Sequence, residues 1–303
     1  MLLTGNCLQL INEIDEDIIQ TIVTSPPYWG LRDYEGEEEQ IGQELTPEEY
    51  VVKMTAFFSL CKRVLKDDGT LWLNIGDTYF GAKGGHWDGG NSITSDATGS
   101  NYRMQRKAPP KHPRLKTKDL TGVPWMLAFA LQKDGWYLRQ DIIWHKPNPM
   151  PEAVTDRCVK SHEHIFLLSK KPKYYFDHEA IQEPAVHVGD NRSSRGDKRR
   201  DVNLANSMSS TSKATGEFRN KRDVWSINTA QSGEAHFAVF PEKIPELCIK
   251  AGSKEGDIVL DPFMGSGTTA KIAQKLGRKW IGFELNDKYA DIIRRKTAQG
   301  ELF

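Results

Sequence analysis

A run of seven residues near the N-terminus, Thr24-Ser25-Pro26-Pro27-Tyr28-Trp29-Gly30, carries groups that could hold a planar amine. It follows an apolar, β-branched run at 18–23 that predicts a buried strand. Two successive prolines cannot continue that strand, because neither has an N–H to donate. The stretch could stack on a flat ring through its aromatics while a serine hydroxyl and free carbonyls accept hydrogen bonds from an amino group. For this stretch in isolation, a Pro-Pro turn with two core aromatics is the favoured interpretation.

A second chemistry-bearing stretch lies between residues 257 and 284. A predicted strand runs into Asp261-Pro262-Phe263-Met264-Gly265-Ser266-Gly267-Thr268-Thr269, a helix follows, and the next strand ends at Glu284. The two glycines let the backbone approach a ligand, and the helix N-terminus offers free N–H groups. An acid about 20 residues beyond the glycines can accept two ribose hydroxyl bonds. Without the lysine of a phosphate loop or a GxGxxG pattern, S-adenosylmethionine fits better than a dinucleotide.

Composition limits the class of protein that could carry these two sites. The chain has 303 residues and zero formal net charge, so any contact with nucleic acid must come from a local basic patch. Four scattered cysteines without CxxC spacing indicate a reducing compartment and no zinc site. We expect no metal at His162-Glu163-His164 either, because a third ligand is missing. No leader or membrane-length apolar run is present, so we expect a soluble, cytoplasmic protein.

The elements that must position these residues alternate between strand and helix. Helix 8–14 precedes the first buried strand. Thr46, as N-cap before Pro47, begins a helix that runs through Leu65 and that Asp67-Asp68-Gly69 ends. Strand, helix and strand joined by short turns predict a parallel sheet. The further predicted strands are 70–75, 137–146, 163–169, 257–260 and 280–284, and the further helices are 124–133, 241–251, a helix ending at 276, and 288–295.

Two polar stretches interrupt this alternation, from about residue 81 to 121 and from about 184 to 222. Their composition of Gly, Ser, Asn and basic residues is typical of solvated loops. Because basic groups on such loops can contact phosphates, a pair of loops that order on a polyanion is the alternative interpretation.

Together the two sites resemble those of amino-methylating DNA methyltransferases in the permuted arrangement called the β class. Asp261–Thr269 resembles the cofactor motif DPFxGSGTT, Glu284 the ribose-binding acid, and Thr24–Tyr28 the catalytic motif (S/D/N)PP(Y/F). His236–Leu247 resembles the helix before the cofactor motif, and Gly5-Asn6-Cys7 the loop beside the adenine, where many members have Asp at the second position. The order of catalytic motif, recognition region and cofactor motif is also the family's.

The resemblance implies an α/β, Rossmann-like methyltransferase fold with a mostly parallel twisted sheet, circularly permuted motif order and inserted target-recognition loops. It divides the chain into a catalytic half (1–80), a flexible DNA-contacting insert (81–122), the remaining strands and helices (123–183), a basic target-recognition insert (184–224) and a cofactor-binding half (225–303).

The resemblance also implies the site residues, with no metal ligand among them. The catalytic set is Ser25, Pro26, Pro27 and Tyr28. The set for S-adenosylmethionine is Asn6, Phe240, Pro241, Asp261, Phe263, Gly265, Ser266, Gly267, Thr268, Thr269 and Glu284. The set for DNA is Trp29, Arg32, Lys146, Arg192, Arg195, Arg199 and Arg200.

The expected reaction follows from these residues. An exocyclic amine is a poor nucleophile, and hydrogen bonds from it to the Ser25 hydroxyl and the Pro26 carbonyl would localise its lone pair. Tyr28 would stack on a base flipped out of the duplex, and orientation would supply most of the rate. Trp29 could add stacking or simply pack in the core. Arg32 and Asp33 could close over the base or form a surface ion pair.

Several alternatives stay open at this point. Serine at the head of the motif usually accompanies cytosine N4 methylation, which we therefore favour over adenine N6. Transfer to RNA or a protein amide, and an inactive DNA-binding module, are rival functions. The expected partners are double-stranded DNA and a separate restriction endonuclease, with the chain a monomer or homodimer and no membrane contact.

Overall fold

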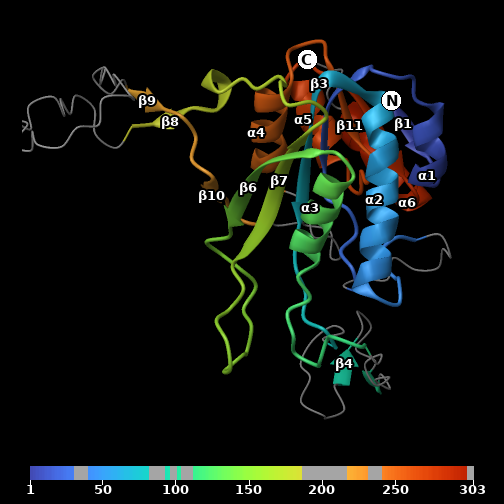
Figure 1. The fold of residues 1–303 in the computed structure, drawn as a ribbon, viewed down its shortest axis with the longest axis vertical. Helices are drawn as coiled ribbons and strands as arrows, with labels where there is room; N and C mark the ends of the chain where they lie inside the picture. Colours follow the sequence, from blue (N-terminus) through green and yellow to red (C-terminus); the bar gives the residue numbers. More distant parts are fainter. Residues whose placement is uncertain are drawn as a thin grey trace, which may run out of the picture.

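An eight-stranded sheet runs through the protein (Figure 1). The structure is a computed structural model, which describes residues 1–30, 40–81, 93–95, 101–103, 112–185, 217–230 and 241–298. In spatial order its strands are β1 (Leu2–Thr4), β12 (Lys279–Glu284), β11 (Ile258–Asp261), β2 (Ile19–Thr24), β3 (Leu65–Ile75), β7 (His162–Ser169), β6 (Tyr137–His145) and β10 (Val224–Ser226). Every neighbouring pair is parallel except the two that involve β7. The predicted mostly parallel α/β sheet is confirmed.

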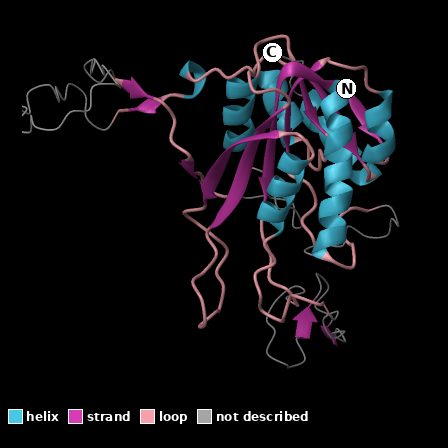
Figure 2. Ribbon diagram, in the orientation of Figure 1, coloured by secondary structure: helices cyan, strands magenta, loops and turns pink. Residues whose placement is uncertain are grey.

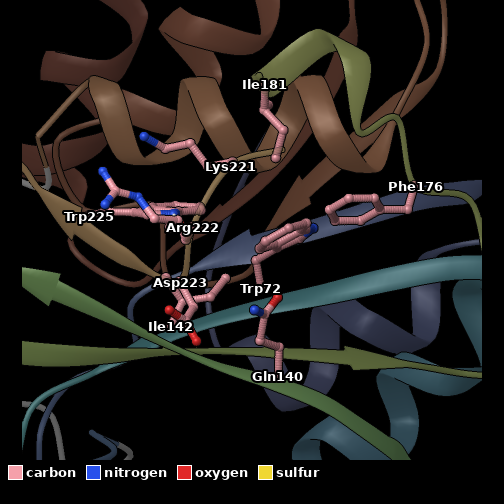
Figure 3. A pocket seen from close by; sticks show the side chains of 9 residues that line it. All are labelled: Trp72, Gln140, Ile142, Phe176, Ile181, Lys221, Arg222, Asp223 and Trp225. Carbon is pink, nitrogen blue, oxygen red and sulfur yellow. The ribbon is translucent and has the colours of Figure 1, made fainter. Parts of the chain in front are cut away.

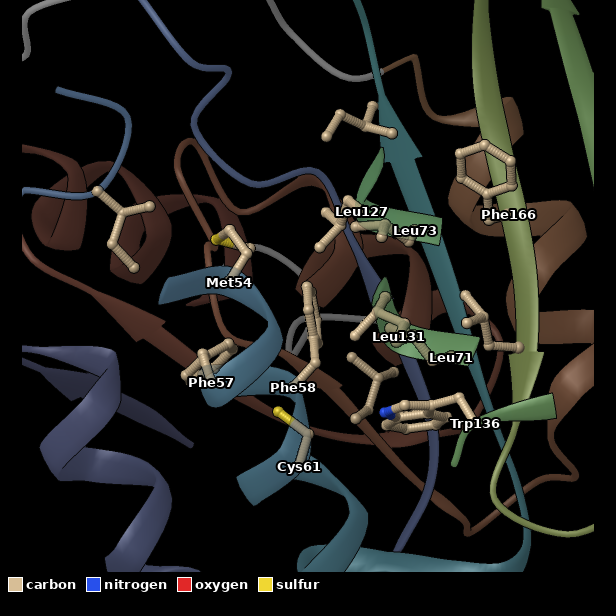
Figure 4. Packing of buried hydrophobic residues seen from close by; sticks show 14 of the residues in the cluster. Met54, Phe57, Phe58, Cys61, Leu71, Leu73, Leu127, Leu131, Trp136 and Phe166 are labelled. Carbon is tan, nitrogen blue, oxygen red and sulfur yellow. The ribbon is translucent and has the colours of Figure 1, made fainter. Parts of the chain in front are cut away.

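Helices cover both faces of this sheet (Figures 1 and 2). One face carries α1 (Cys7–Leu10), the 3-10 helix η1 (Ile11–Glu13), α2 (Pro47–Val64) and α3 (Val123–Lys133), and the other α4 (Lys243–Gly252), α5 (Thr268–Lys275) and α6 (Asp287–Ala298). Along β3, Leu71 and Leu73 face α2 and α3, as Figure 4 shows, whereas Trp72 faces α4. This alternation builds two apolar cores from one strand.

α2 begins where the sequence predicted and ends at Val64, one residue before the predicted Leu65. Thr46 accepts from the Glu49 N–H at 3.2 Å while the Glu49 carboxylate accepts from the Thr46 N–H at 3.3 Å, a complete capping box. β3 then begins at Leu65, so Asp67-Asp68-Gly69, which were predicted to end the helix, lie within a strand, and that strand begins five residues before the predicted 70–75. These residues form a bulge within β3, because Ile19 pairs with Leu65 and Thr21 with Thr70.

Glycine at position 69 has a packing reason in that bulge. A Cβ atom there would lie 2.5 Å from Leu65 Cγ, so only glycine lets the bulged chain fold back over the buried Leu65 side chain. Gly69 thus allows β3 to begin at the buried Leu65.

Among the described residues, two two-stranded sheets lie outside the main sheet. β4 (Ile93–Ser95) pairs with β5 (Asn101–Arg103), and β8 (Glu183–Pro184), after the 3-10 helix η2 (Glu179–Ile181), pairs with β9 (Phe218–Arg219). The carboxylate of Glu183 forms ion pairs with Arg219, Lys221 and Arg222, and these ion pairs connect the two ends of the second basic stretch. Beside these ion pairs, a small pocket is lined by the rings of Trp72, Phe176 and Trp225 (Figure 3).

The topology brings distant chain segments to one edge of the sheet. The carboxyl ends of the parallel strands β1, β12, β11, β2 and β3 meet there, and antiparallel β7 begins there. Strand order reverses between β11 and β2, and open α/β sheets bind ligands at such a switch point. In the part of the chain that the structure describes, no helix is long and apolar enough to cross a membrane.

Candidate active site

A buried hydrogen bond joins the two strands at the switch point. Thr24, the last residue of β2, donates its hydroxyl to Asp261 Oδ1, at the end of β11, over 2.7 Å. The Phe263 N–H donates to the same oxygen over 3.1 Å. Burial raises the pKa of Asp261 to about 6, and the Thr24 bond acts against that rise. The catalytic and cofactor motifs therefore start from one shared contact.

The loop after β2 places Ser25 and Tyr28 in a network of polar side chains. Tyr28 donates its hydroxyl to Glu163 Oε2 over 2.6 Å, and Ser25 Oγ lies 3.3 Å from Tyr28 Oη. The Asn74 amide nitrogen lies 3.2 Å from Ser25 Oγ, 2.9 Å from Tyr28 Oη and 3.1 Å from Glu163 Oε2. Burial, and after it the charge of Glu163, raise the pKa of Tyr28 well above its usual value, so this side chain stays a neutral phenol.

Two neighbouring elements support the loop from Ser25 to Tyr28, which we call the catalytic loop. From α2, the Tyr50 hydroxyl donates to the Pro27 carbonyl over 2.9 Å. From the turn after β3, Gly76 lies against the Tyr28 ring, since a Cβ atom there would come within 2.7 Å of Tyr28 Cε2. Beside it, Asp77 accepts from the Thr121 hydroxyl at 2.6 Å and from the Gly122 N–H, which anchors the start of α3. The loop is therefore held before any ligand binds.

The turn after β11 has the shape that its glycines predicted. Gly265 and Gly267 have φ values of +53° and +81°, in the region that favours glycine. A Cβ at Gly267 would lie 3.0 Å from Ile293 of α6, so the second glycine allows close helix packing. A Cβ at Gly265 would meet nothing within 4 Å, so the first glycine faces open space. The turn leads into α5, whose N-terminus has no side-chain cap.

Glu284 is bound to this turn. Its Oε2 accepts from the Gly265 N–H over 2.8 Å and its Oε1 from the Asn286 N–H over 2.9 Å. A carboxylate has about four acceptor positions, so two backbone bonds leave capacity for ribose hydroxyls. Burial raises the pKa of Glu284 to about 7 despite these bonds. An acceptor acid, an open glycine and an uncapped helix end together fit the adenosyl, ribose and carboxylate groups of S-adenosylmethionine.

Other residues predicted for the cofactor take mainly structural contacts. Asn6 caps α1 by accepting from the Leu8 N–H at 2.9 Å. The Gly5 N–H next to it donates to the Glu284 carbonyl at 2.9 Å, which places this loop at the site. Phe263 packs edge-on against Phe57 of α2. Thr268 and Thr269 are buried at the start of α5, the Ser266 carbonyl accepts from Lys296, and buried Pro241 lies just before α4. Their contacts with the cofactor remain predictions.

The residues predicted for DNA fall into three groups. Trp29 is 8% exposed, stacks on Phe80, and donates its indole N–H to the Glu44 carbonyl at 2.9 Å, so in this structure it packs in the core. Lys146 is ion-paired with Glu163. Arg32, Asp33, Arg192, Arg195, Arg199 and Arg200 lie outside the described residues, as does Phe240 of the cofactor set. The DNA-binding assignment of all these residues remains a prediction.

Sequence reasoning missed Asn74 and Glu163. Glu163 lies between two histidines on β7, and the rings of His162 and His164 lie on the sheet face opposite to its carboxylate, where His164 stacks on Phe166. The alternation of a strand predicts that opposite direction, and it was the available signal. Among the described residues, no cluster of three His, Cys, Asp or Glu side chains could hold a metal ion.

Comparisons with known proteins agree with this geometry. A family model described as DNA methylase, of the N6/N4 type, matches residues 19–295. The Type II methyltransferase M.SmaI of Serratia marcescens is 45% identical over 97% of this chain and 89% of its own length. The PvuII DNA methyltransferase (cytosine-N4-specific) has a similar fold, with a TM-score of 0.62 at 19% identity over 98% of this chain and 92% of its own. The M1.HpyAVI–SAM complex gives 0.55 at 16% over 98% of each chain.

The fold and site define a Rossmann-like methyltransferase with its catalytic motif before its cofactor motif. The chain belongs to the N6/N4 family of DNA methylases. It is an enzyme that transfers a methyl group from S-adenosylmethionine to an exocyclic amine of DNA, as the sequence predicted.

Proposed function

We propose that the methyl group goes to N4 of cytosine in double-stranded DNA, with Ser25, Pro26, Pro27 and Tyr28 as the catalytic residues. The observation that carries this choice is the hydroxyl of Ser25 at the head of the motif, within hydrogen-bond distance of two other polar side chains. A neutral hydroxyl at this position accompanies cytosine in the family pattern, where Asp or Asn accompanies adenine. Adenine N6 is the alternative, since it presents a similar amine beside a ring nitrogen.

The proposed roles use the geometry of the two sites. When bound, S-adenosylmethionine supplies an activated methyl group at the switch point. Gly265, Gly267 and Glu284 bind it through the open turn and the acceptor carboxylate. Ser25 Oγ and the Pro26 carbonyl accept hydrogen bonds from the target amine, and Tyr28 stacks on the flipped base. Because the polar network already holds these groups, orientation supplies much of the rate.

The test is to incubate the protein with labelled S-adenosylmethionine and unmodified duplex DNA, digest the DNA and identify the methylated nucleoside by mass spectrometry. We expect N4-methylcytosine. N6-methyladenine would overturn the choice of base and leave the class of reaction intact. No methylated nucleoside on DNA of varied sequence would contradict the proposal and direct the search to RNA or protein amides.

We further propose that residues 81–122 and 184–224 contact the DNA around the target base. What supports this is their basic composition and the clamp of Glu183 on Arg219, Lys221 and Arg222, which fixes the base of the second stretch beside the sheet. Alanine at Arg192, Arg195, Arg199 and Arg200 should weaken DNA binding and flatten its salt dependence. An unaltered salt slope would mean that these arginines are only solvated.

The wider setting of the enzyme is also a proposal. Relatives that are 42–45% identical to this chain are named Type II methyltransferases, which supports a cytoplasmic modification enzyme that works beside a separate restriction endonuclease. We propose a monomer or homodimer, which sedimentation at several concentrations would distinguish.

A further inference from the structure

Glu163, whose side chain is 14% exposed, is the acid that accepts a hydrogen bond from Tyr28 of the catalytic loop. Lys146 pairs with its Oε1, so that Oε2 is left to face the loop. Oε2 accepts from the Tyr28 hydroxyl over 2.6 Å and from the Asn74 amide over 3.1 Å. A distance of 2.6 Å is typical of a strong hydrogen bond between a hydroxyl and an ionised carboxylate. Glu163 therefore determines where the hydrogen of Tyr28 lies.

Counting hydrogens then fixes the direction of the next bond. A phenol has one hydrogen, and Tyr28 gives its own to Glu163. In the 3.3 Å contact between Ser25 Oγ and Tyr28 Oη, the serine must therefore be the donor. The hydrogens run in one direction, from Ser25 to Tyr28 to Glu163.

The same count shows what Ser25 has left for the substrate. Its oxygen has one hydrogen and two lone pairs. The hydrogen points to Tyr28, and one lone pair faces the Asn74 amide nitrogen at 3.2 Å, which shares its two hydrogens among Ser25, Tyr28 and Glu163. The second lone pair can accept one hydrogen from the target amine. A carboxylate at position 163 thus keeps Ser25 an acceptor toward the substrate.

We propose that Ser25, Tyr28 and Glu163 form a proton relay for the methylated amine, with Glu163 as a positioning residue that orients the relay and receives the proton. The proposal rests on the proposed catalytic role of Ser25 and goes beyond it, because it holds for either base. It also gives a role to Glu163, whose carboxylate β7 directs toward the catalytic loop.

The step balances without any further reactant. The amine nitrogen forms a bond to the methyl carbon as the carbon–sulfur bond breaks, and the electron pair of that bond stays on sulfur. The nitrogen then carries one proton too many. That proton passes to Ser25 Oγ, the serine hydrogen passes to Tyr28 Oη, and the tyrosine hydrogen passes to Glu163. The products are a neutral methylamine, an unchanged serine and tyrosine, and a protonated carboxyl at Glu163.

The test uses Glu163→Gln, Tyr28→Phe and the double variant, with single-turnover methyl transfer measured at saturating cofactor and DNA. Glutamine keeps the shape of the side chain and cannot take up the proton, and phenylalanine keeps the stacking ring and removes one oxygen. We expect each single variant to lose about 100-fold in rate, at the lower end of the range of general acid–base effects. The double variant should lose no more than the worse single, because both interrupt one chain.

Dissociation constants for S-adenosylmethionine and DNA should stay close to those of the parent in both single variants. A purely structural role would instead weaken binding or folding along with the rate. Asp257→Asn is the matched control, because it removes another half-buried, ion-paired carboxylate, bound to Lys66 at the opposite edge of the sheet, and should keep the parental rate.

Three results would overturn the relay: single-variant rates within two-fold of the parent, losses that multiply in the double variant, or an equal loss in Asp257→Asn. Should Glu163→Gln fold poorly, Tyr28→Phe still decides, because it deletes a single oxygen. Ser25→Ala separates this proposal from the one it rests on. A fully active Ser25→Ala would refute the catalytic role of Ser25, whereas an inactive one beside active Tyr28→Phe and Glu163→Gln would refute only the relay.

Discussion

The cofactor turn and the catalytic loop meet at one edge of the sheet and are built differently. At the turn, the Glu284 carboxylate is held by the backbone N–H groups of Gly265 and Asn286, all within one β–α–β unit. At the loop, Ser25 is held by Asn74, 49 positions away, which in turn contacts Glu163, 89 positions further on. Backbone contacts from neighbouring residues make the first site, and side chains from the loop after β2 and from strands β3 and β7 make the second.

The largest effect should come from breaking the catalytic loop while leaving the cofactor turn alone. Tyr28→Ala removes both the ring that we propose stacks on the base and the hydroxyl between Ser25 and Glu163. We expect methyl transfer to fall by at least about 100-fold, since positioning and proton transfer are both lost. Cofactor affinity, measured by calorimetry, should stay near that of the parent. Turnover within a few-fold of the parent would contradict the role of Tyr28 in methyl transfer.

This difference in construction also explains what the sequence could predict. The glycines, the acid and the helix start of the cofactor turn lie within one contiguous stretch, so spacing alone located them. The capping box at Thr46 was equally local. To predict the role of Glu163, one must know that β7 runs antiparallel beside β3, and no local pattern in 162–169 indicates that pairing. Trp29 was left between stacking and core packing, because only its contacts with Phe80 and Glu44 distinguish the two.

A smaller effect, confined to the other region, is expected from Glu284→Gln. Loss of the charged acceptor for the ribose hydroxyls should weaken cofactor binding by about 10-fold, the value of one hydrogen bond to a charged group. Because the pKa of Glu284 is raised to about 7, only the ionised form at higher pH is the better acceptor. Cofactor affinity of the parent should therefore rise from pH 6 to pH 8, and that of the variant should not. Equal pH dependence in calorimetry would remove the ribose assignment.

The same group should make the stability of the cofactor-free protein depend on pH. Its folded pKa of about 7 lies above its ordinary value of 4.5, so the folded protein binds the proton more tightly than the unfolded chain. The stabilisation that Glu284 contributes to the folded protein is fully present below pH 4.5 and is lost as the pH rises through 7. Glu284→Gln should flatten that decline in urea unfolding between pH 5 and pH 8. A parallel decline in parent and variant would assign it to other groups, Asp261 first among them.

The smallest expected change lies at the junction, in Thr24→Val, which keeps the shape of the side chain and removes its hydrogen bond to Asp261. Both groups are buried, so the loss should cost about 1–3 kcal/mol of unfolding free energy. The Thr24 bond lowers the pKa of Asp261, and the variant should therefore be destabilised more at pH 8, where the carboxylate is ionised, than at pH 5. Urea unfolding at the two pH values measures this difference. Because the bond joins β2 to β11, the variant should also reduce cofactor affinity and methyl transfer together. A loss in one without the other would show that the two sites are held independently and that the Thr24–Asp261 contact only stabilises the sheet.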